Sequence, residues 1–464
     1  MLPSSLVISV DRSAGRTLAV QIADCIRAAI DGGHIEFGAR LPSSRALSDE
    51  IGVARANVEN AYDQLTAEGW IDARHGAGTY VRRIPAERSV TSRPTRSAAS
   101  TPHTPERRVR LATGTPWVSP RVSAAWRRAW REVGTAPPPQ SYPDPRGEPH
   151  LRAAVADLLG RARGLKTDAE SVIITTGSMH GMALALPALA DSSSSPGLAH
   201  ENPGYRVATT TATRWGWSVH DVSVDADGMV IDELNRAPSN TRAVYVTPSH
   251  QYPTGGLLPV GRRRALADVA RRRDLMIIED DYDSEFRYGV APLPTVAELA
   301  PDRTVYLGTV AKTLGGGIRI GWLVAPRHVL DRIVDVRTDL GDYPSLPVQH
   351  ATASLLRDGE WDRTVRAARR LYRERDRRVA ARLAEFGELR GVGAGMHTTL
   401  LLDPGVATAV AARAAAEGVD IDTLAESTRT DSPVTGLIVG YGSVSEDELA
   451  YGLDVLTDAL RSVN

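Results

Sequence analysis

The sequence has 464 residues and a formal net charge of −1, with 42% hydrophobic and 24% charged residues, a composition typical of globular proteins. No apolar run approaches the length of a membrane span, and the N-terminal residues lack the pattern of a signal peptide. We therefore expect a cytoplasmic protein with no membrane partner. The single cysteine, Cys25, excludes an intrachain disulfide and a cysteine-based zinc cluster, and we expect no metal site.

Residues 1–83 carry the pattern of three helices followed by a hairpin. Apolar residues recur at helical spacing in Leu18–Ile30 and again in Leu41–Ile51, where a serine can cap the helix. A third helix is predicted for Ala54–Leu65. The segment Trp70–Val81 predicts two short strands around a glycine-rich tip. This order of elements is that of a winged helix-turn-helix domain.

The third helix of such a domain can lie in the major groove of DNA. Its N-terminal residues Arg55 and Asn57 would then face base edges. Arg45, at the start of the second helix, can hold a phosphate, and the wing tip at His75 and Gly76 can approach the backbone or the minor groove. A winged helix that binds protein is the alternative. We expect DNA, because arginines occupy the contact positions.

This domain resembles the DNA-binding domain of the GntR regulator superfamily across the whole region. The matching strings are LPSSRAL (41–47), GVAR (52–55), AEGW (67–70) and HGAGTYV (75–81). The resemblance implies that the DNA contacts come from Arg45, Arg55, Asn57, His75 and Gly76. Glu59 departs from the pattern, because some relatives carry a basic residue at that position.

Residues 84–108 are rich in serine, threonine, proline and arginine. Such a stretch buries too little apolar surface to offset the entropy lost on ordering. We therefore predict a flexible linker between two parts of the chain.

Residues 109–464 alternate apolar, strand-like runs with amphipathic helices, which predicts an α/β domain with a mostly parallel sheet. The strand-like runs include Val172–Thr175, Ala243–Val246, Leu275–Ile278, Val305–Leu307 and Trp322–Ala325. From about residue 347 long helices precede shorter strands and helices, so residues 347–464 are predicted to form a smaller α+β subdomain. Within it, Trp361–Leu383 is rich in arginine. We expect a solvated or subunit-facing helix there, with an auxiliary DNA surface as the alternative.

Lysine occurs only twice, at Lys166 and Lys312, while arginine supplies the other positive side chains. Only a primary amine can form a Schiff base with an aldehyde. Lys312 lies in GTVAKTLGGGIR (308–319), between an apolar strand and an arginine, which suits a cofactor lysine beside a phosphate pocket. The alternative is that Lys312 has no special role and is present by chance in a composition that favours arginine over lysine. Lys166 lies in a polar turn and is predicted to be a solvated surface charge.

Four further features give Lys312 a chemical context. TGSMHGMA (176–183) follows a strand and opens a helix, where backbone N–H groups can meet a phosphate. Tyr205, after another strand, can stack on a planar ring. The buried strand that runs into EDDYDSEF (279–286) offers a carboxylate that can keep a pyridine nitrogen protonated. Arg319 can clamp a phosphate with two parallel hydrogen bonds.

Together these segments resemble the fold-type I aminotransferases that use pyridoxal phosphate, over essentially all of residues 109–464. The finer resemblance is to the MocR subfamily, in which a GntR-type domain is fused to an aminotransferase-like domain. It is carried by SHQYPTG (249–255) and EDDYDSEF (279–286). Five elements in the expected order argue against a chance lysine. The resemblance implies a multidomain protein with pyridoxal phosphate as its cofactor.

The resemblance also implies roles for individual residues. Lys312 would form the internal aldimine, and Asp280 would pair with the pyridine nitrogen. Tyr282 would hydrogen-bond the ring hydroxyl, and Tyr205 would stack on the ring face. The remaining cofactor contacts, including those to the phosphate, would come from Ser178, Met179, Thr309 and Arg319.

Two departures from the aminotransferase pattern concern the ring and the substrate. Tyr252 stands before Pro253 where aminotransferases carry an asparagine, so that ring contact is expected to be replaced or absent. The C-terminal stretch TGLIVGYG (435–442) lacks the arginine that holds a substrate carboxylate. Arg429 or Arg206 could substitute for it. Without either, amino-acid substrates lose a charge-assisted contact of about 1.5–3 kcal/mol.

These features predict a transcriptional regulator that senses pyridoxal phosphate, or a small amino compound forming an aldimine with it, and moves its DNA-binding domain in response. Members of this subfamily control vitamin B6 synthesis, so vitamin B6 or amino-compound metabolism is the expected target. The resemblance implies a domain-swapped homodimer that reads two half-sites, expected in the promoter upstream of its own or a neighbouring gene. The alternative is a catalytically active aminotransferase with a secondary DNA-binding domain.

Overall fold

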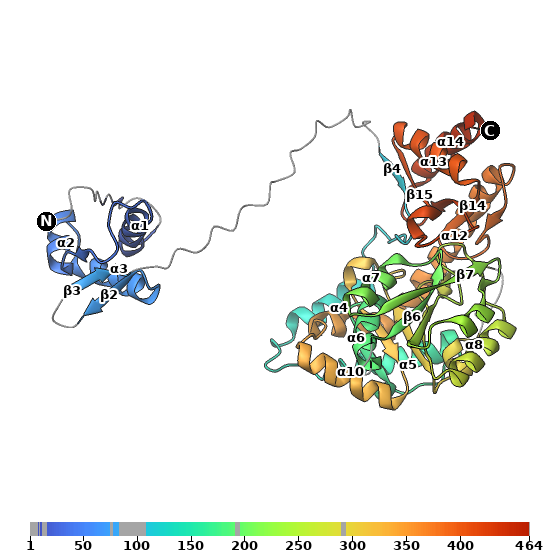
Figure 1. The fold of residues 1–464 in the computed structure, drawn as a ribbon, viewed down its shortest axis with the longest axis horizontal. Helices are drawn as coiled ribbons and strands as arrows, with labels where there is room; N and C mark the ends of the chain where they lie inside the picture. The colour runs from blue at the N-terminus through green and yellow to red at the C-terminus, as the bar shows by residue number, and fades with distance from the viewer. Residues whose placement is uncertain are drawn as a thin grey trace. The chain divides into compact units, whose positions relative to one another are not determined.

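The computed structural model describes two compact units, Met1–Thr101 and Pro102–Asn464, and Figure 1 shows the fold of each. The described residues are 8, 10–11, 16–74, 78–82, 108–190, 195–288 and 294–463. The predicted linker, apart from Arg108, therefore lies outside the described residues. The wing-tip residues His75 and Gly76 lie outside them as well.

The first unit combines three helices with an antiparallel sheet in the strand order β1-β3-β2. Its elements are α1 (Leu18–Asp31), β1 (Arg40–Leu41), α2 (Ser44–Ile51), α3 (Arg55–Ala67), β2 (Ile71–Arg74) and β3 (Gly78–Val81). The Ser43 hydroxyl caps α2 by accepting from Ala46 N, and Gly52 ends that helix in the left-handed conformation. The tight turn that follows leads directly into α3. The predicted winged helix-turn-helix order is the one observed.

The second unit is built on an eight-stranded sheet in the order β5-β12-β11-β10-β9-β6-β7-β8. The strands are β5 (Val172–Thr175), β6 (Gly197–Asn202), β7 (Ser218–Asp225), β8 (Gly228–Met229), β9 (Thr241–Val246), β10 (Met276–Asp280), β11 (Thr304–Thr309) and β12 (Gly321–Val324). Neighbours from β11 to β7 pair in parallel, whereas β12 is antiparallel to both of its neighbours. The sheet is therefore mostly parallel, as predicted.

Helices cover both faces of this sheet because successive strand residues point in opposite directions. Ile173 and Ile174 of β5, for example, belong to different buried clusters. One face is covered by α6 (Ser178–Leu189), α7 (Arg206–Arg214) and α10 (Arg327–Leu340). The other is covered by α4 (Ala124–Thr135), α5 (Pro149–Arg163), α8 (Val260–Arg272) and α11 (Leu346–Arg357).

A smaller subdomain carries a five-stranded sheet in the order β13-β14-β16-β15-β4, coloured orange to red in Figure 1 except for β4. Its elements are β4 (Val109–Leu111), α12 (Glu360–Leu383), β13 (Leu389–Arg390), β14 (His397–Leu401), α13 (Pro404–Ala416), β15 (Val419–Thr423), β16 (Gly436–Gly440) and α14 (Glu446–Val463). In α12, Arg369 and Arg373 donate to backbone carbonyls of residues 285 and 288, so these two arginines are used within the fold.

The position of β4 differs from the sequence-based expectation that the small subdomain begins near residue 347. β4 pairs in parallel with β15, about 310 residues further along the chain, and buries Val109 and Leu111 in the core of the small subdomain. A pairing over this sequence distance leaves no local signal, because it depends on packing and not on periodicity. Across the described ranges, no helix is both long enough and apolar enough to cross a membrane.

The core of the first unit generates a stability prediction. Leu47 of α2 is completely buried there, so Leu47→Ala should lower the free energy of unfolding of this unit by about 2–5 kcal/mol. Peptide-resolved hydrogen exchange of the full chain should show faster exchange within residues 18–81 and unchanged exchange in residues 109–463. Glu50→Ala, an exposed change in the same helix, is the control. Equal loss of protection in both units would contradict independent cores.

Candidate functional site

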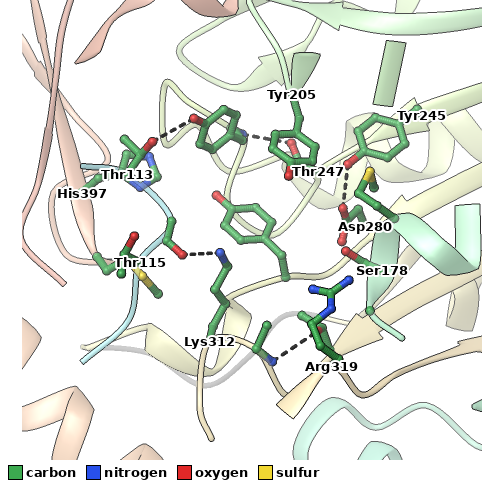
Figure 2. Close-up of a pocket in the computed structure, with 18 residues that line it drawn as sticks. Thr113, Thr115, Ser178, Tyr205, Tyr245, Thr247, Asp280, Lys312, Arg319 and His397 are labelled. Carbon is green, nitrogen blue, oxygen red and sulfur yellow. Dashed lines mark hydrogen bonds between the residues drawn. The ribbon is translucent and has the colours of Figure 1, made fainter. Parts of the chain in front are cut away.

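A cavity of about 320 Å³ lies where β9, β10 and β11 end and α6 begins, the edge at which parallel α/β sheets bind ligands. Figure 2 shows the side chains that line it. All the residues that the sequence predicts as cofactor contacts line this one cavity: Ser178, Met179, Tyr205, Asp280, Tyr282, Thr309, Lys312 and Arg319. The structure therefore brings together residues up to 141 positions apart in the sequence.

Lys312 follows β11 and points into the cavity (Figure 2). Its Nζ donates a hydrogen bond to the carbonyl oxygen of Gly114. Gly114 has a φ of +73°, and a Cβ there would lie 3.2 Å from Nζ, so a side chain at this position would crowd the amine. Burial lowers the pKa of Lys312, although the charges of Asp283 and Asp280 act in the opposite direction. At a given pH this shift increases the fraction of neutral amine, which is the nucleophilic form.

Asp280 is the carboxylate of the 279–281 cluster that lines the cavity. Its Oδ2 accepts from the Tyr245 hydroxyl at 2.6 Å, whereas its buried Oδ1 has no hydrogen-bond partner among the described residues. Burial raises the pKa of Asp280 to about 6, and the Tyr245 bond and the Lys312 charge oppose that rise. A buried acceptor without a donor is costly. A protonated pyridine nitrogen is a donor that fits this position.

The two neighbouring carboxylates are used elsewhere. Glu279 accepts from the backbone N–H groups of Val296 and Ala297 at 3.0 and 2.8 Å, at the start of α9 (Val296–Leu299). Asp281 forms a buried ion pair with Arg163, in which Nε and Oδ2 are 2.6 Å apart. Strand alternation alone does not distinguish Glu279 from Asp281. Their separate partners leave Asp280 as the acceptor for a ligand.

Three tyrosine rings form the walls of the cavity. The rings of Tyr205 and Tyr252 meet edge to face with centroids 5.4 Å apart, and those of Tyr252 and Tyr282 do so at 6.2 Å. The Tyr282 hydroxyl donates to the carbonyl oxygen of His250 at 3.0 Å. Tyr252 thus occupies the wall between the other two rings, which suits enclosure of a flat ligand.

The opposite end of the cavity is suited to an anion. Gly177 precedes α6 with φ +127° and supplies no side-chain cap, so the N–H groups of the first turn remain open. A Cβ on Gly177 would lie 3.5 Å from Nη2 of Arg319, and a Cβ on Gly321 would lie 2.7 Å from the Cα of Gly177. These glycines keep the backbone close to the guanidinium. The helix dipole and Arg319 together favour a phosphate here.

The two arginines considered for a substrate carboxylate do not line the cavity. Arg429 Nε is paired with Asp221 Oδ1 at 3.0 Å, and Arg206 Nη1 donates to the carbonyl oxygen of Thr428 at 2.7 Å. Burial lowers the pKa of His397, which does line the cavity, to about 3. Among the described lining residues, the cationic side chains are therefore Lys312 and Arg319.

Several lining residues escaped the sequence-based reasoning. Tyr245 carried a findable signal, since it lies near the end of a strand beside the one that ends in Asp280. Thr113, Gly114 and Thr115 carried none, because they follow a three-residue strand whose partner is far away in the sequence. At Tyr252, the sequence predicts that the ring contact made by an asparagine in aminotransferases is replaced or absent. The Tyr252 hydroxyl lies 3.0 Å from Thr113 Oγ1.

Of the five residues predicted to contact DNA, Arg45 lies on α2 and Arg55 and Asn57 lie on α3 of the first unit. Arg45 is exposed near the start of α2, and Asn57 is half-buried in the first turn of α3. The side chain of Arg55 is 61% exposed, and its Nε is paired with Glu59 Oε1 at 2.8 Å. Glu59 thus neutralises the arginine that the sequence assigns to base contacts.

Comparisons with known proteins match both units. The family model "Bacterial regulatory proteins, gntR family" matches residues 18–81, and "Aminotransferase class I and II" matches residues 108–425. The chain is 35% identical to the HTH-type pyridoxine biosynthesis transcriptional regulator PdxR of Corynebacterium glutamicum, over 98% of this chain and 99% of the relative. It is 31% identical to the probable rhizopine catabolism regulatory protein MocR of Rhizobium meliloti, over 98% and 96%.

Solved aminotransferases share the fold of the second unit. An archaeal alanine:glyoxylate aminotransferase is 25% identical with a TM-score of 0.69, over 77% of this chain and 91% of that one. The α-aminoadipate aminotransferase LysN of Thermus thermophilus, in complex with N-(5'-phosphopyridoxyl)-L-leucine, is 26% identical with a TM-score of 0.67, over 77% and 92%. The predicted fold-type I aminotransferase fold is confirmed.

The lowered pKa of Lys312 predicts how its reactivity depends on pH. A depressed pKa leaves more neutral amine at a given pH, so condensation with pyridoxal phosphate should persist to lower pH than for free lysine, whose pKa is about 10.4. The rate, followed by the absorbance of the lysine-bound cofactor, should fall with a midpoint below that value. Lys312→Arg, which keeps the charge but has no primary amine, is the control. A midpoint at or above the free-lysine value would contradict this account.

Proposed function

Because the chain belongs to the MocR subfamily of GntR-type transcriptional regulators, we propose that pyridoxal phosphate itself is the signal that it senses. The protein is a DNA-binding transcriptional regulator, and pyridoxal phosphate is its cofactor. Its relatives support regulation over the alternative of an active aminotransferase. We place its action in the cytoplasm, on the promoter of its own or a neighbouring gene, where it would control vitamin B6 metabolism.

The cavity residues divide into three groups around the cofactor. Bound pyridoxal phosphate supplies an aldehyde that bonds to a primary amine and a ring that withdraws electrons. Lys312 would provide the amine, and Asp280 Oδ1 would accept the proton-bearing ring nitrogen. Tyr205 would stack on the ring and Tyr282 would contact its hydroxyl. The phosphate end would be held by Ser178, Met179, Thr309 and Arg319.

The observation that carries the choice of signal is the absence of a carboxylate clamp among the described lining residues. Arg429 and Arg206, the two candidates, are engaged with Asp221 and with a backbone carbonyl. An amino-acid ligand would have to break these contacts before it gained a charge-assisted hydrogen bond. Pyridoxal phosphate needs no such clamp. An amino compound bound to the cofactor is the second candidate, and the named function of the PdxR relative favours the first.

A homodimer that reads two half-sites is part of the proposal. The second unit exposes large apolar side chains at Val118, Val122 and Leu340, and Tyr142 is 89% exposed; a second copy could cover such side chains. The 25 residues of the predicted linker, 84–108, could reach about 80–90 Å when fully extended. That reach would allow the winged helix of one chain to pack with the second unit of its partner, and the dimer would present two winged helices to DNA.

The proposal predicts that the cofactor changes DNA binding. Affinity of the full chain for DNA upstream of its own gene should change by about 5- to 150-fold when pyridoxal phosphate is added, the usual range of coupling between two sites. Lys312→Ala should abolish the change. Lys166→Ala, which removes the only other lysine, should leave it intact. Equal affinity of the wild type for DNA with and without the cofactor would show that pyridoxal phosphate is not the signal.

The Arg55–Glu59 ion pair predicts opposite effects of two substitutions on DNA affinity. Arg55→Ala should weaken specific binding by about 1–3 kcal/mol, because it removes a base-edge contact. Glu59→Gln should strengthen it by about 2- to 5-fold, since it frees Arg55 from an exposed pair of modest energy and removes a charge that repels phosphate. Fluorescence anisotropy with a labelled duplex measures both. Glu50→Gln, on the exposed face of α2, controls for net charge, and an equal gain from it would contradict a specific pair.

A further inference from the structure

Residues 112–117, which we call the strap, connect β4 of the small subdomain to the cavity. β4 is held by its pairing with β15, and Arg108 at its start forms two hydrogen bonds of 2.8 Å with Asp420. The strap then lies directly on the end of β16. A Cβ on Gly440 would be 2.0 Å from the carbonyl oxygen of Ala112, and one on Gly442 would be 2.2 Å from that of Thr115. The strap is therefore packed against the small subdomain without space between them.

Two contacts tie the strap to the residues around the cofactor (Figure 2). Lys312 Nζ donates to the carbonyl oxygen of Gly114. The Tyr252 hydroxyl lies 3.0 Å from Thr113 Oγ1, which in turn donates to Asp422 Oδ2 at 3.0 Å, and Thr113 N donates to the same oxygen at 3.2 Å. Since the single proton of the Thr113 hydroxyl goes to Asp422, Tyr252 is the donor to Thr113. A continuous chain of hydrogen bonds thus joins the cavity wall to β15.

The strap also lies next to the DNA-binding unit in the sequence. Residues 83–107 lead from the winged helix to Arg108, and β4 and the strap follow at once. Trp117, at the end of the strap, is anchored by its backbone N–H, which donates to the Tyr372 hydroxyl at 2.6 Å. In the described part of the effector unit, the strap that follows β4 therefore forms a wall of the cavity.

Cofactor attachment must change one of these contacts. When the neutral Lys312 amine reacts with the aldehyde of pyridoxal phosphate, a C=N bond forms to Nζ and the aldehyde oxygen leaves as water with the two amine protons. No electrons are transferred to or from a third group. The neutral amine offers two N–H donors before the reaction, and the nitrogen of the neutral C=N product offers none. The carbonyl oxygen of Gly114 then loses the donor that holds it.

We infer that the strap carries the state of the cofactor cavity to the DNA-binding unit, with Asp422, Thr113 and Tyr252 as the positioning residues that set its alternative arrangement. This inference rests on the proposed function, because pyridoxal phosphate is the ligand that removes the Lys312 contact. Loss of that contact leaves the strap held by the hydrogen bonds to Asp422, which then determine where it moves.

The test uses the full chain and removes Asp422, which does not line the cavity. DNA affinity is measured by anisotropy with and without pyridoxal phosphate in the wild type, Asp422→Ala, Asp422→Asn and Asp447→Ala. Asp447 lies in the first turn of α14 and is exposed, so its removal is the matched control. The absorbance of the lysine-bound cofactor confirms that each variant still binds pyridoxal phosphate. Hydrogen exchange of residues 109–118 in the wild type is measured in parallel.

The expected result is a cofactor effect of about 5-fold or more in the wild type and Asp447→Ala, and about 2-fold or less in Asp422→Ala with its cofactor still bound. Asp422→Asn, which keeps an acceptor oxygen, should fall between them. Exchange at the strap should change when the wild type is loaded. A wild-type response in Asp422→Ala would overturn the inference.

The remaining outcomes separate this inference from the proposed function. In one outcome, pyridoxal phosphate does not change the DNA affinity of the wild type, but hydrogen exchange in the strap changes when the cofactor binds. The proposed signal then fails, and the link between cavity and strap stands. If exchange is the same in the free and loaded wild type, the strap does not report the cavity and the inference falls. That measurement needs no variant, so it also decides the case in which Asp422→Ala fails to fold or to bind the cofactor.

Discussion

A carboxylate buried at the end of a strand must be hydrogen-bonded, paired with a cation or protonated, and three of them stand in succession where β10 ends. Glu279 is satisfied by the start of α9 and Asp281 by Arg163. Asp280 is half satisfied, by Tyr245, and keeps one buried oxygen free of described partners. Among the described lining residues, Asp280 thus offers a buried carboxylate oxygen to a ligand. We propose that a ring meeting this oxygen would have its aldehyde end oriented by Lys312 and its phosphate end by Arg319.

The cavity belongs to two subdomains that pack through glycines. A Cβ on Gly395 would be 2.2 Å from His250 Cε1, and one on Gly255 would be 2.2 Å from the Cα of Gly391. Side chains at these positions would push the small subdomain away from the large one. Closely packed interfaces shift between discrete arrangements and do not deform continuously. In our inference, a change of contact at Lys312 moves the strap as a unit, and residues 83–107 and β4 connect the strap to the DNA-binding unit in the sequence.

The DNA-binding unit has its own electrostatic constraint. Arg55 is paired with Glu59 within one helix, and the pair is largely exposed, so it contributes little to stability. We propose that its effect is on DNA binding, because an Arg55 that contacts DNA would have to exchange a carboxylate for the DNA. On this proposal the neutralised contact would weaken DNA binding, so that a modest coupling from the effector unit would change occupancy more readily.

The sequence by itself determined the winged helix, the alternating strands and helices, and the importance of Lys312, because local periodicity, capping residues and a rare amine are visible in one dimension. The tertiary structure alone decided three points: that the neighbours of Asp280 are satisfied elsewhere, that Arg429 and Arg206 are engaged elsewhere, and that β4 joins β15. Each depends on partners that lie between 17 and about 310 residues away in the chain. Such pairings follow from how the layers pack, and no short stretch of sequence records them.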